Sequence, residues 1–238
     1  METLQVERAN GVVTVTMNRP EVKNAINVVM WSELLETFRA VACSADDRAL
    51  VLTGAGGEFS SGGDVSDRSQ EGTATTPLAA MRLVGEVAVA LHRLPVPSIA
   101  KVTGVAVGAG MNLALGCDLV VATPTARFSE IFHRRGFSID CGGSWLLPRL
   151  IGMQRAKELA FFAEMVSAEE AAGLGLVNRV VPASEIDEVV GNWAARLASG
   201  PSIALGLTKK LLNEAFTGSL EAAVESEARA QIINAGSL

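Results

Sequence analysis

Residues 99–122 read IAKVTGVAVGAGMNLALGCDLVVA, and this stretch decides the fold that the sequence predicts. A short apolar run over 98–102 breaks at Thr103-Gly104, and three glycines fall within 104–110. Apolar residues at helical spacing follow, and a run rich in valine closes the stretch at 119–122. The pattern predicts a strand, a glycine-rich turn, a short helix and a second strand.

The glycine-rich turn indicates a binding function. Glycines at the start of a helix let a ligand approach the backbone, and the unpaired N–H groups there favour negative charge. Such a turn can hold a phosphate, or a carbonyl oxygen that becomes an oxyanion. A glycine-rich helix packed tightly in the core is the alternative interpretation.

A dinucleotide is the first ligand to consider. Thr103-Gly104-x-x-x-Gly108-x-Gly110 resembles the cofactor turn of short-chain dehydrogenases. Those enzymes need a catalytic tyrosine, and this chain contains none. Their cofactor turn also lies near the N-terminus, whereas here about a hundred residues precede it. We therefore do not expect a nicotinamide cofactor.

Composition narrows the class of protein. The 238 residues are 49% apolar, which is enough for one large domain with a sizeable core. The net charge is −6 and there is no basic run, so nucleic acid is not an expected partner. The three cysteines are widely separated and predict reduced thiols, with neither a disulfide frame nor a metal site. They are Cys43, Cys117 and Cys141.

The N-terminal sequence METLQVERANGVVTV has neither a basic nor an apolar signal region. The most apolar long stretch, 102–122, carries Asn112, Asp118 and four glycines. A buried helix and strand fit this stretch better than a membrane span does. We therefore expect a cytoplasmic protein with no membrane partner.

Secondary-structure signals continue along the chain. Alternating segments at 4–7 and 12–17 flank Asn10-Gly11, which predicts a hairpin. A buried strand at 49–53 runs into a second glycine-rich turn over 54–64. This strand–glycine pattern and the one at 98–110 lie about fifty residues apart, which predicts repeated ββα units around a parallel sheet. Beyond Phe128 the chain is expected to be mostly helical.

Five segments in this order resemble the crotonase (enoyl-CoA hydratase/isomerase) family. They are Asn18-Arg19-Pro20 with Asn24-Ala25, LTGAGGEFSSGGD at 52–64, the stretch at 99–122, GGSWLLPRLIG at 142–152 and SAEEAAGLGLVNRVVP at 167–182. The resemblance implies an α/β protein of the ClpP/crotonase fold, with the acyl-CoA site in a core at 1–182. It implies a C-terminal helical region at 183–238 that serves in oligomerisation and covers the site. The assembly would be a homotrimer or a hexamer formed as a dimer of trimers.

The resemblance also implies an acyl-CoA thioester as substrate, with no separate cofactor and no metal. Its carbonyl would be held by two backbone N–H groups that stabilise an enolate. By motif position these belong to Ser61 and Ala109. Both residues lie in glycine turns, and Ala109 is expected at a helix N-terminus, where negative charge is stabilised. The Ser61 hydroxyl is not an expected nucleophile, because no G-x-S-x-G surrounds it.

The sequence departs from the family's hydratases, which use two glutamates to hold and activate a water. The matching positions here are Asn112 and Phe132. Asp140 instead begins Asp-x-Gly-Gly-x-Trp-Leu-Leu-Pro-Arg, which resembles the family's isomerases, notably the ring-epoxide isomerase type of phenylacetyl-CoA breakdown. An aspartate at this position transfers the proton in several members.

We expect Asp140 to be a single carboxylate in apolar surroundings, with a raised pKa that suits it to moving a carbon-bound proton. The surrounding apolar residues would be Phe137, Ile139, Cys141 and Trp145. One base suffices for isomerisation, whereas hydration also needs a positioned water. The alternative for Asp140 is a cap on the helix opening at Gly142. Glu130, a second nearby carboxylate, stands two positions from the family's glutamate site.

The remaining candidates are binding residues. For the nucleotide end of CoA, the resemblance implies Lys23 and the backbone around Ala25, although Lys23 also fits a solvated surface lysine. Asp64 is expected to bond the backbone of its own turn. Trp145 fits the core or the wall of an acyl pocket. Three glycines of the two turns complete the predicted binding set, namely Gly62, Gly108 and Gly110.

These observations favour an acyl-CoA enzyme that stabilises a thioester enolate and isomerises a double bond or a ring, with Asp140 as the proton shuttle. An enoyl-CoA hydratase with an unconventional site that uses Glu130 is one alternative. A non-catalytic acyl-CoA-binding protein is another, since both glutamate positions have lost their carboxylates.

Overall fold

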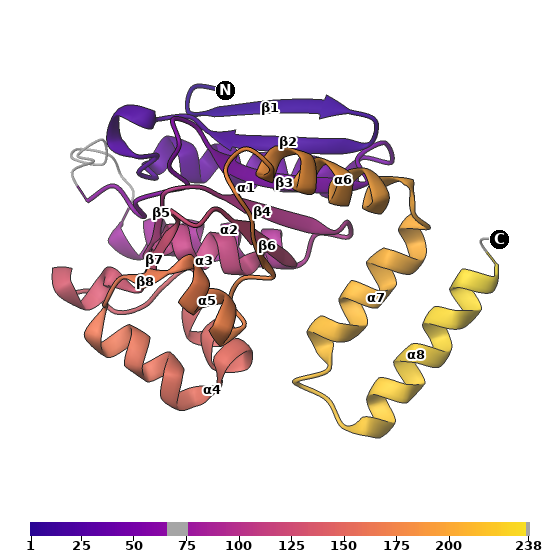
Figure 1. Ribbon diagram of the computed structural model, residues 1–238. Helices are drawn as coiled ribbons and strands as arrows, with labels where there is room; N and C mark the ends of the chain where they lie inside the picture. The colour runs from indigo at the N-terminus through magenta and orange to yellow at the C-terminus, as the bar shows by residue number, and fades with distance from the viewer. Residues whose placement is uncertain (66–75, 237–238) are drawn as a thin grey trace.

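The computed structural model describes residues 1–65 and 76–236. Its described part contains a six-stranded sheet in the order β1-β2-β3-β4-β6-β9 and a three-stranded sheet in the order β5-β7-β8, with helices packed around them (Figure 1). The larger sheet consists of β1 (Leu4–Ala9), β2 (Val12–Met17), β3 (Ala49–Gly54), β4 (Ser98–Val102), β6 (Leu119–Ala122) and β9 (Arg179–Val180). The smaller sheet consists of β5 (Val105–Val107), β7 (Arg127–Ser129) and β8 (Val166–Ser167).

The N-terminal hairpin confirms the prediction from the sequence. β1 and β2 are antiparallel, with Ala9 opposite Val12. Asn10 and Gly11 join them with φ values of 52° and 79°. Positive φ at both central residues is what a tight two-residue hairpin turn requires. From β2 onward every neighbouring pair of the larger sheet is parallel.

Helices cover both faces of the larger sheet. Alternate side chains of β3 are buried on opposite faces. Leu50 and Leu52 are fully buried in the main core, whereas Val51 packs on the opposite face against α6 (Ile186–Ser199). A strand buried on both faces is typical of a parallel sheet. The main core is formed with helices α1 (Val28–Cys43), α2 (Pro77–His92) and α3 (Ala109–Gly116).

Four further helical segments complete the core region. They are the 3₁₀ turns η1 (Pro20–Val22) and η2 (Ile131–Arg135), the long helix α4 (Gly143–Phe162) and the short helix α5 (Ala168–Leu174). A capping box opens α5, since Ser167 and Glu170 exchange side-chain-to-backbone hydrogen bonds. The last strand of the larger sheet is the two-residue β9.

The last two helices, α7 (Ser202–Glu214) and α8 (Leu220–Ala235), extend away from the sheets as an antiparallel pair (Figure 1). Buried Lys209 fixes α7 to the core, because its Nζ lies 2.7 Å from the Asp118 carboxylate and donates to the Val96 carbonyl at 3.1 Å. Within the predicted helical region 183–238, α6 packs against the larger sheet, and only α7 and α8 project away from the sheets.

Two observations concern surfaces and thiols. In the described residues no helix is long and apolar enough to cross a membrane. Cys117 and Cys141 are buried, whereas Cys43 is exposed.

Candidate active site

The predicted glycine turn before α3 has the geometry of an anion site. Gly108 adopts φ +54° and donates its N–H to the Ser129 carbonyl at 2.8 Å. The helix then begins at Ala109. The Ala109 N–H is the first of α3 and has no carbonyl one turn earlier to receive it. Among the described residues it has no hydrogen-bond acceptor, so it can donate to a ligand.

The second predicted glycine turn packs directly against the first. A Cβ at Gly62 would lie 2.8 Å from the Val107 carbonyl oxygen and 3.5 Å from the Ala109 nitrogen. Gly62 also has φ +89°, a region that L side chains rarely adopt. A Cβ at Gly110 would lie 2.7 Å from the Ser60 carbonyl oxygen. These glycines let the two turns meet, whereas ligand contact by Gly62, Gly108 and Gly110 stays a prediction.

The structure contradicts the expected donor role of Ser61. Its N–H donates to the Lys23 carbonyl at 2.9 Å, and its hydroxyl donates to the Val22 carbonyl at 3.0 Å. The backbone N–H that the prediction assigns to a ligand is therefore already used inside the protein.

Gly63 is the residue of this turn with an available N–H. The Ile26 N–H donates to the Gly62 carbonyl, and the Asp64 N–H donates to the Ile26 carbonyl. This is a parallel bridge between Ile26 and Gly63, in which Gly63's own N–H points to the side away from Ile26. That N–H has no acceptor among the described residues. The sequence missed Gly63 because only this bridge shows which N–H of the turn is free.

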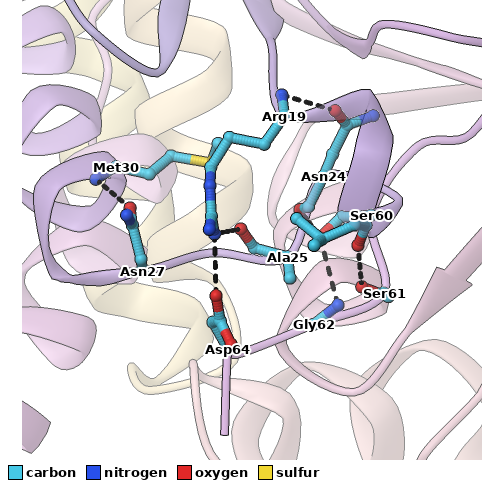
Figure 2. A network of polar contacts seen from close by, with 10 residues as sticks. Arg19, Asn24, Ala25, Asn27, Met30, Ser60, Ser61, Gly62 and Asp64 are labelled. Carbon is cyan, nitrogen blue, oxygen red and sulfur yellow. Dashed lines mark hydrogen bonds and ion pairs between the residues drawn. The ribbon is translucent and has the colours of Figure 1, made fainter. Parts of the chain in front are cut away.

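A cluster of polar side chains contacts the second glycine turn (Figure 2). The Arg19 guanidinium donates to the Ala25 carbonyl at 2.7 Å and to the Asp64 carboxylate at 2.9 Å. The Arg19 N–H donates to the Asn24 side chain, whose amide donates to the Ala55 and Glu58 carbonyls. Asp64 thus pairs with Arg19, a partner that the sequence did not reveal. The cluster ties 19–25 to the second glycine turn.

The predicted CoA-binding residues have partners within the protein. The Lys23 ammonium lies 2.9 Å from the Glu58 carboxylate, and the Lys23 side chain is mostly exposed. The Ala25 N–H donates to the Val22 carbonyl. CoA binding by Lys23 and Ala25 stays a prediction.

Asp140 has a second carboxyl group beside it, so the expectation of a single carboxylate is wrong. The Asn112 amide, one turn along α3 from Ala109, donates to the Glu130 carboxyl group at 3.3 Å and to the Asp140 backbone carbonyl at 3.0 Å. Asn112 and Glu130 are each only 1% exposed. This contact places Asp140 beside the same helix whose N-terminus carries the free N–H of Ala109.

Burial changes the acidity of this group. It raises the pKa of Glu130 to about 8, an effect that the Asp140 charge reinforces. It raises the pKa of Asp140 to about 6. The two acids are therefore suited to different states at neutral pH, with Asp140 ionised and Glu130 neutral. Burial and the same two carboxyl groups raise the pKa of the Cys141 thiol well above its usual range.

The structure does not support the interpretation of Asp140 as a helix cap. Helix α4 begins at Gly143 with Gly142 as its N-cap, and no side chain caps it. The Asp140 Oδ1 atom is buried and has no hydrogen-bond partner. Phe137, expected to help bury Asp140, is 59% exposed and does not do so. Phe132, which by motif position replaces one of the two glutamates of the family's hydratases, lies on η2.

Trp145 lies beside a cavity of about 1130 Å³ rather than in the interior of the core. Its ring makes an edge contact with His92, and the Arg149 guanidinium stacks 4.1 Å from its centre. The cavity lies between the core and α7 and reaches Asn112 and Cys141. Gly63, Ala109 and Asp140 are not among its lining residues, so the cavity adjoins the site and is separate from it.

In the described part of the chain, no three His, Cys, Asp or Glu side chains are grouped as metal ligands would be. The polar groups of the site are two backbone N–H donors, the Asn112 amide and the carboxyl groups of Glu130 and Asp140. Such a set suits the binding of a carbonyl oxygen and the transfer of a proton.

Comparisons with known proteins agree with the resemblance seen in the sequence. The profile of the enoyl-CoA hydratase/isomerase family matches residues 7–234. A Rhodobacter capsulatus protein named Probable enoyl-CoA hydratase is 40% identical, over 96% of this chain and 88% of the relative. The 1,2-epoxyphenylacetyl-CoA isomerase of Escherichia coli is 38% identical, over 95% and 88%. The crystal structure of a Mycobacterium smegmatis enoyl-CoA hydratase superposes with a TM-score of 0.91 at 33% identity, over 98% of this chain and 90% of that chain.

Proposed function

The chain belongs to the enoyl-CoA hydratase/isomerase family, and on this premise we propose that it isomerises the double bond or ring of an acyl-CoA thioester. The observation that supports isomerisation best is Asp140. Its Oδ1 atom is buried and unpaired, and its pKa of about 6 leaves it ionised but still basic at neutral pH.

We assign the thioester carbonyl to the N–H groups of Gly63 and Ala109. Removal of a proton from the carbon next to the thioester moves negative charge onto its oxygen. Two N–H groups of adjoining turns, one of them at a helix N-terminus, stabilise that charge. Asp140 takes the proton, is neutral while the enolate exists, and returns the proton to a different carbon. No external water enters this sequence of steps.

Hydration is the second candidate, and Glu130 is the observation that favours it. A buried carboxyl group beside Asp140 offers a second acid, as hydration needs. A Clostridium acetobutylicum relative named Short-chain-enoyl-CoA hydratase is 33% identical. The choice between isomerisation and hydration thus depends on whether Asp140 and Glu130 together position a water. A non-catalytic acyl-CoA-binding protein is the third candidate, and the raised pKa of Asp140 argues against it.

A turnover screen with 3-enoyl-, 2-enoyl- and aryl-CoA thioesters tests these candidates. We expect the purified protein to convert a 3-enoyl-CoA into the conjugated 2-enoyl-CoA and to hydrate the latter slowly or not at all. Brisk hydration would overturn the isomerase assignment. Tight binding with no turnover of any thioester would instead favour the non-catalytic protein.

Asp140→Asn tests the proton shuttle. The amide is nearly isosteric, so ligand affinity is expected to stay within a few-fold, while kcat is expected to fall by about 10²-fold or more. Wild type is expected to exchange the α-proton of a saturated acyl-CoA in D₂O, and the variant is not. Asp187→Asn, at an exposed aspartate paired with Lys101, is the matched control. Full activity in Asp140→Asn would refute the assignment.

A further inference from the structure

Three buried oxygen atoms around Asn112 have no hydrogen-bond partner within residues 1–65 and 76–236. They are Asn112 Oδ1, Glu130 Oε1 and Asp140 Oδ1. The Asn112 amide nitrogen already donates to the Glu130 Oε2 atom and to the Asp140 carbonyl. An amide oxygen and ionised carboxylates can only accept hydrogen bonds. Three unpaired acceptors in one buried cluster are costly unless a proton is present among them.

Glu130 is the group that fits this proton best. It is 1% exposed, and its only hydrogen-bond donor among the described residues is the Asn112 amide at a long 3.3 Å. A buried carboxylate with one weak donor is strongly destabilised, so the neutral acid is preferred. Its pKa of about 8 agrees with this geometry. When Glu130 is neutral, no second negative charge lies beside the ionised Asp140.

We propose that Glu130 is a positioning residue for Asp140, which as a neutral acid holds the Asn112 amide against the Asp140 turn and which on ionisation disrupts that turn and stops catalysis. The inference rests on the proposed role of Asp140. Glu130 does not contact the substrate in this scheme and acts through the Asn112 amide.

The packing around the Asn112 amide explains how the effect reaches Asp140. A Cβ at Gly143 would lie 2.6 Å from the Asn112 Cγ atom, so the amide rests on the backbone that follows Asp140. Once Glu130 is ionised, two negative charges face each other with a single amide donor. Water entering to solvate them displaces the Asn112 amide from the Asp140 carbonyl and releases the base.

Among the described residues, the titratable groups that interact electrostatically with Glu130 are Asp140 and Cys141. Helix α3 presents no titratable side chain to it. On the segment before α4 the titratable neighbours are Asp140, with a pKa of about 6, and Cys141, whose thiol stays neutral. The basic side chains of η2, namely His133, Arg134 and Arg135, are exposed to solvent. An activity change near pH 8 would therefore report Glu130 itself.

The pH dependence of isomerisation tests the proposal. In wild type we expect kcat to rise as Asp140 ionises and to fall again above about pH 8. Glu130→Gln, which is isosteric and always neutral, is expected to keep the rise, to retain kcat within about threefold at pH 7 and to lose the alkaline fall. Glu130→Ala, which removes the Asn112 contact, is expected to lower kcat at every pH with little change in KM. Glu86→Gln, at an exposed pair with Arg39, is the matched control.

An unchanged alkaline fall in Glu130→Gln would overturn the proposal, as would its absence in wild type. Loss of all activity in folded Glu130→Gln would also overturn it, because Glu130 would then act directly on the substrate.

Carbon-13 NMR with labelled glutamate and aspartate side chains separates this inference from the proposed function, since it needs no turnover. In wild type we expect one glutamate signal to titrate near pH 8 and the Asp140 signal to show a second titration step near the same pH. In Glu130→Gln that glutamate signal and the second step of the Asp140 signal are both expected to be absent. An ordinary pKa for Glu130 would overturn the inference even in an active isomerase. An inactive wild type with the expected titrations would overturn only the proposed function.

Discussion

We infer that an asparagine at position 112, in place of a glutamate, determines which groups of the site can donate hydrogen bonds. The family's hydratases carry a glutamate at the matching motif position, whereas the amide here donates to Glu130 and to the Asp140 carbonyl. A second glutamate in its place would put a third carboxyl group beside two others and would have no proton to donate when ionised. The amide therefore organises two acids without competing with them.

The proposed oxyanion hole can be tested at Gly63. A Cβ at Gly63 meets no atom within 4 Å, so Gly63→Ala keeps both the space and the N–H. We expect it to retain most activity. Gly63→Pro removes the N–H, and the loss of one such donor typically costs about 10²–10³ in kcat. Steady-state kinetics on folded variants measure the difference. Equal activity of the two variants would exclude the Gly63 N–H as a donor.

Ionisation of Glu130 also affects stability. Its folded pKa of about 8 exceeds the ordinary value of 4.5. Between these values the folded protein keeps a proton that the unfolded chain releases, so stability falls as pH rises through this window and is level above it. The fall is at most roughly 5 kcal/mol. Glu130→Gln is expected to match wild type near pH 4 and to exceed its unfolding free energy near pH 9, measured by urea denaturation. Parallel curves for the two proteins would contradict a raised pKa.

At the scale of elements, the close approach of α3 to the start of α4 holds the site together. Gly143→Ala would force a Cβ into the Asn112 amide, because the space there is filled. We expect a loss of roughly 1–3 kcal/mol in stability and at least about a tenfold loss in kcat, as Asp140 loses its support. Gly191→Ala in α6 is the matched control, since a Cβ there meets nothing, and it is expected to stabilise by up to about 1 kcal/mol. Unchanged kcat in Gly143→Ala would show that the contact does not position Asp140.

The elements that could be predicted from the sequence are those set by local rules. Asn10-Gly11 alone specifies its hairpin turn, and Ser167 with Glu170 specifies the start of α5. The α/β class and the crotonase fold are confirmed by the family match and by the superposition with its solved structures.

The parts of the site that could not be predicted depend on contacts between distant segments. Ser61 and Gly63 both lie in a glycine turn, and only the hydrogen bond to Lys23 and the bridge to Ile26 decide which N–H is free. Glu130 lies eighteen residues from Asn112, so no local pattern places its carboxyl group against that amide. The raised pKa expected for Asp140 agrees with the structure, in which its Oδ1 atom is desolvated, although the exposed Phe137 is not among the groups that bury it.

At the scale of the whole molecule, α7 and α8 leave a large apolar surface uncovered. Several of their large side chains are about half exposed or more, as is Phe216 in the turn between them; those on the helices are Ile203, Leu212, Leu220, Val224, Ile232 and Ile233. Scattered exposed apolar residues are normal in a monomer, but a run of them on two projecting helices is typical of a subunit interface. Leu207 and Leu211 of α7 are partly covered. We infer that other copies of the chain cover these helices.

Assembly can be measured directly by light scattering coupled to size exclusion. We expect a trimer, or a hexamer formed from two trimers, at micromolar concentration. Ile232→Glu places a charge on the 76%-exposed side chain of α8, and a desolvated, unpaired charge in an interface is strongly unfavourable. The variant is therefore expected to dissociate at concentrations where wild type stays assembled. Lys210→Glu, at an exposed position of α7, is the control for the added negative charge and is expected to assemble normally. A compact monomer of wild type would leave the apolar faces of α7 and α8 without a partner and would refute the inferred assembly.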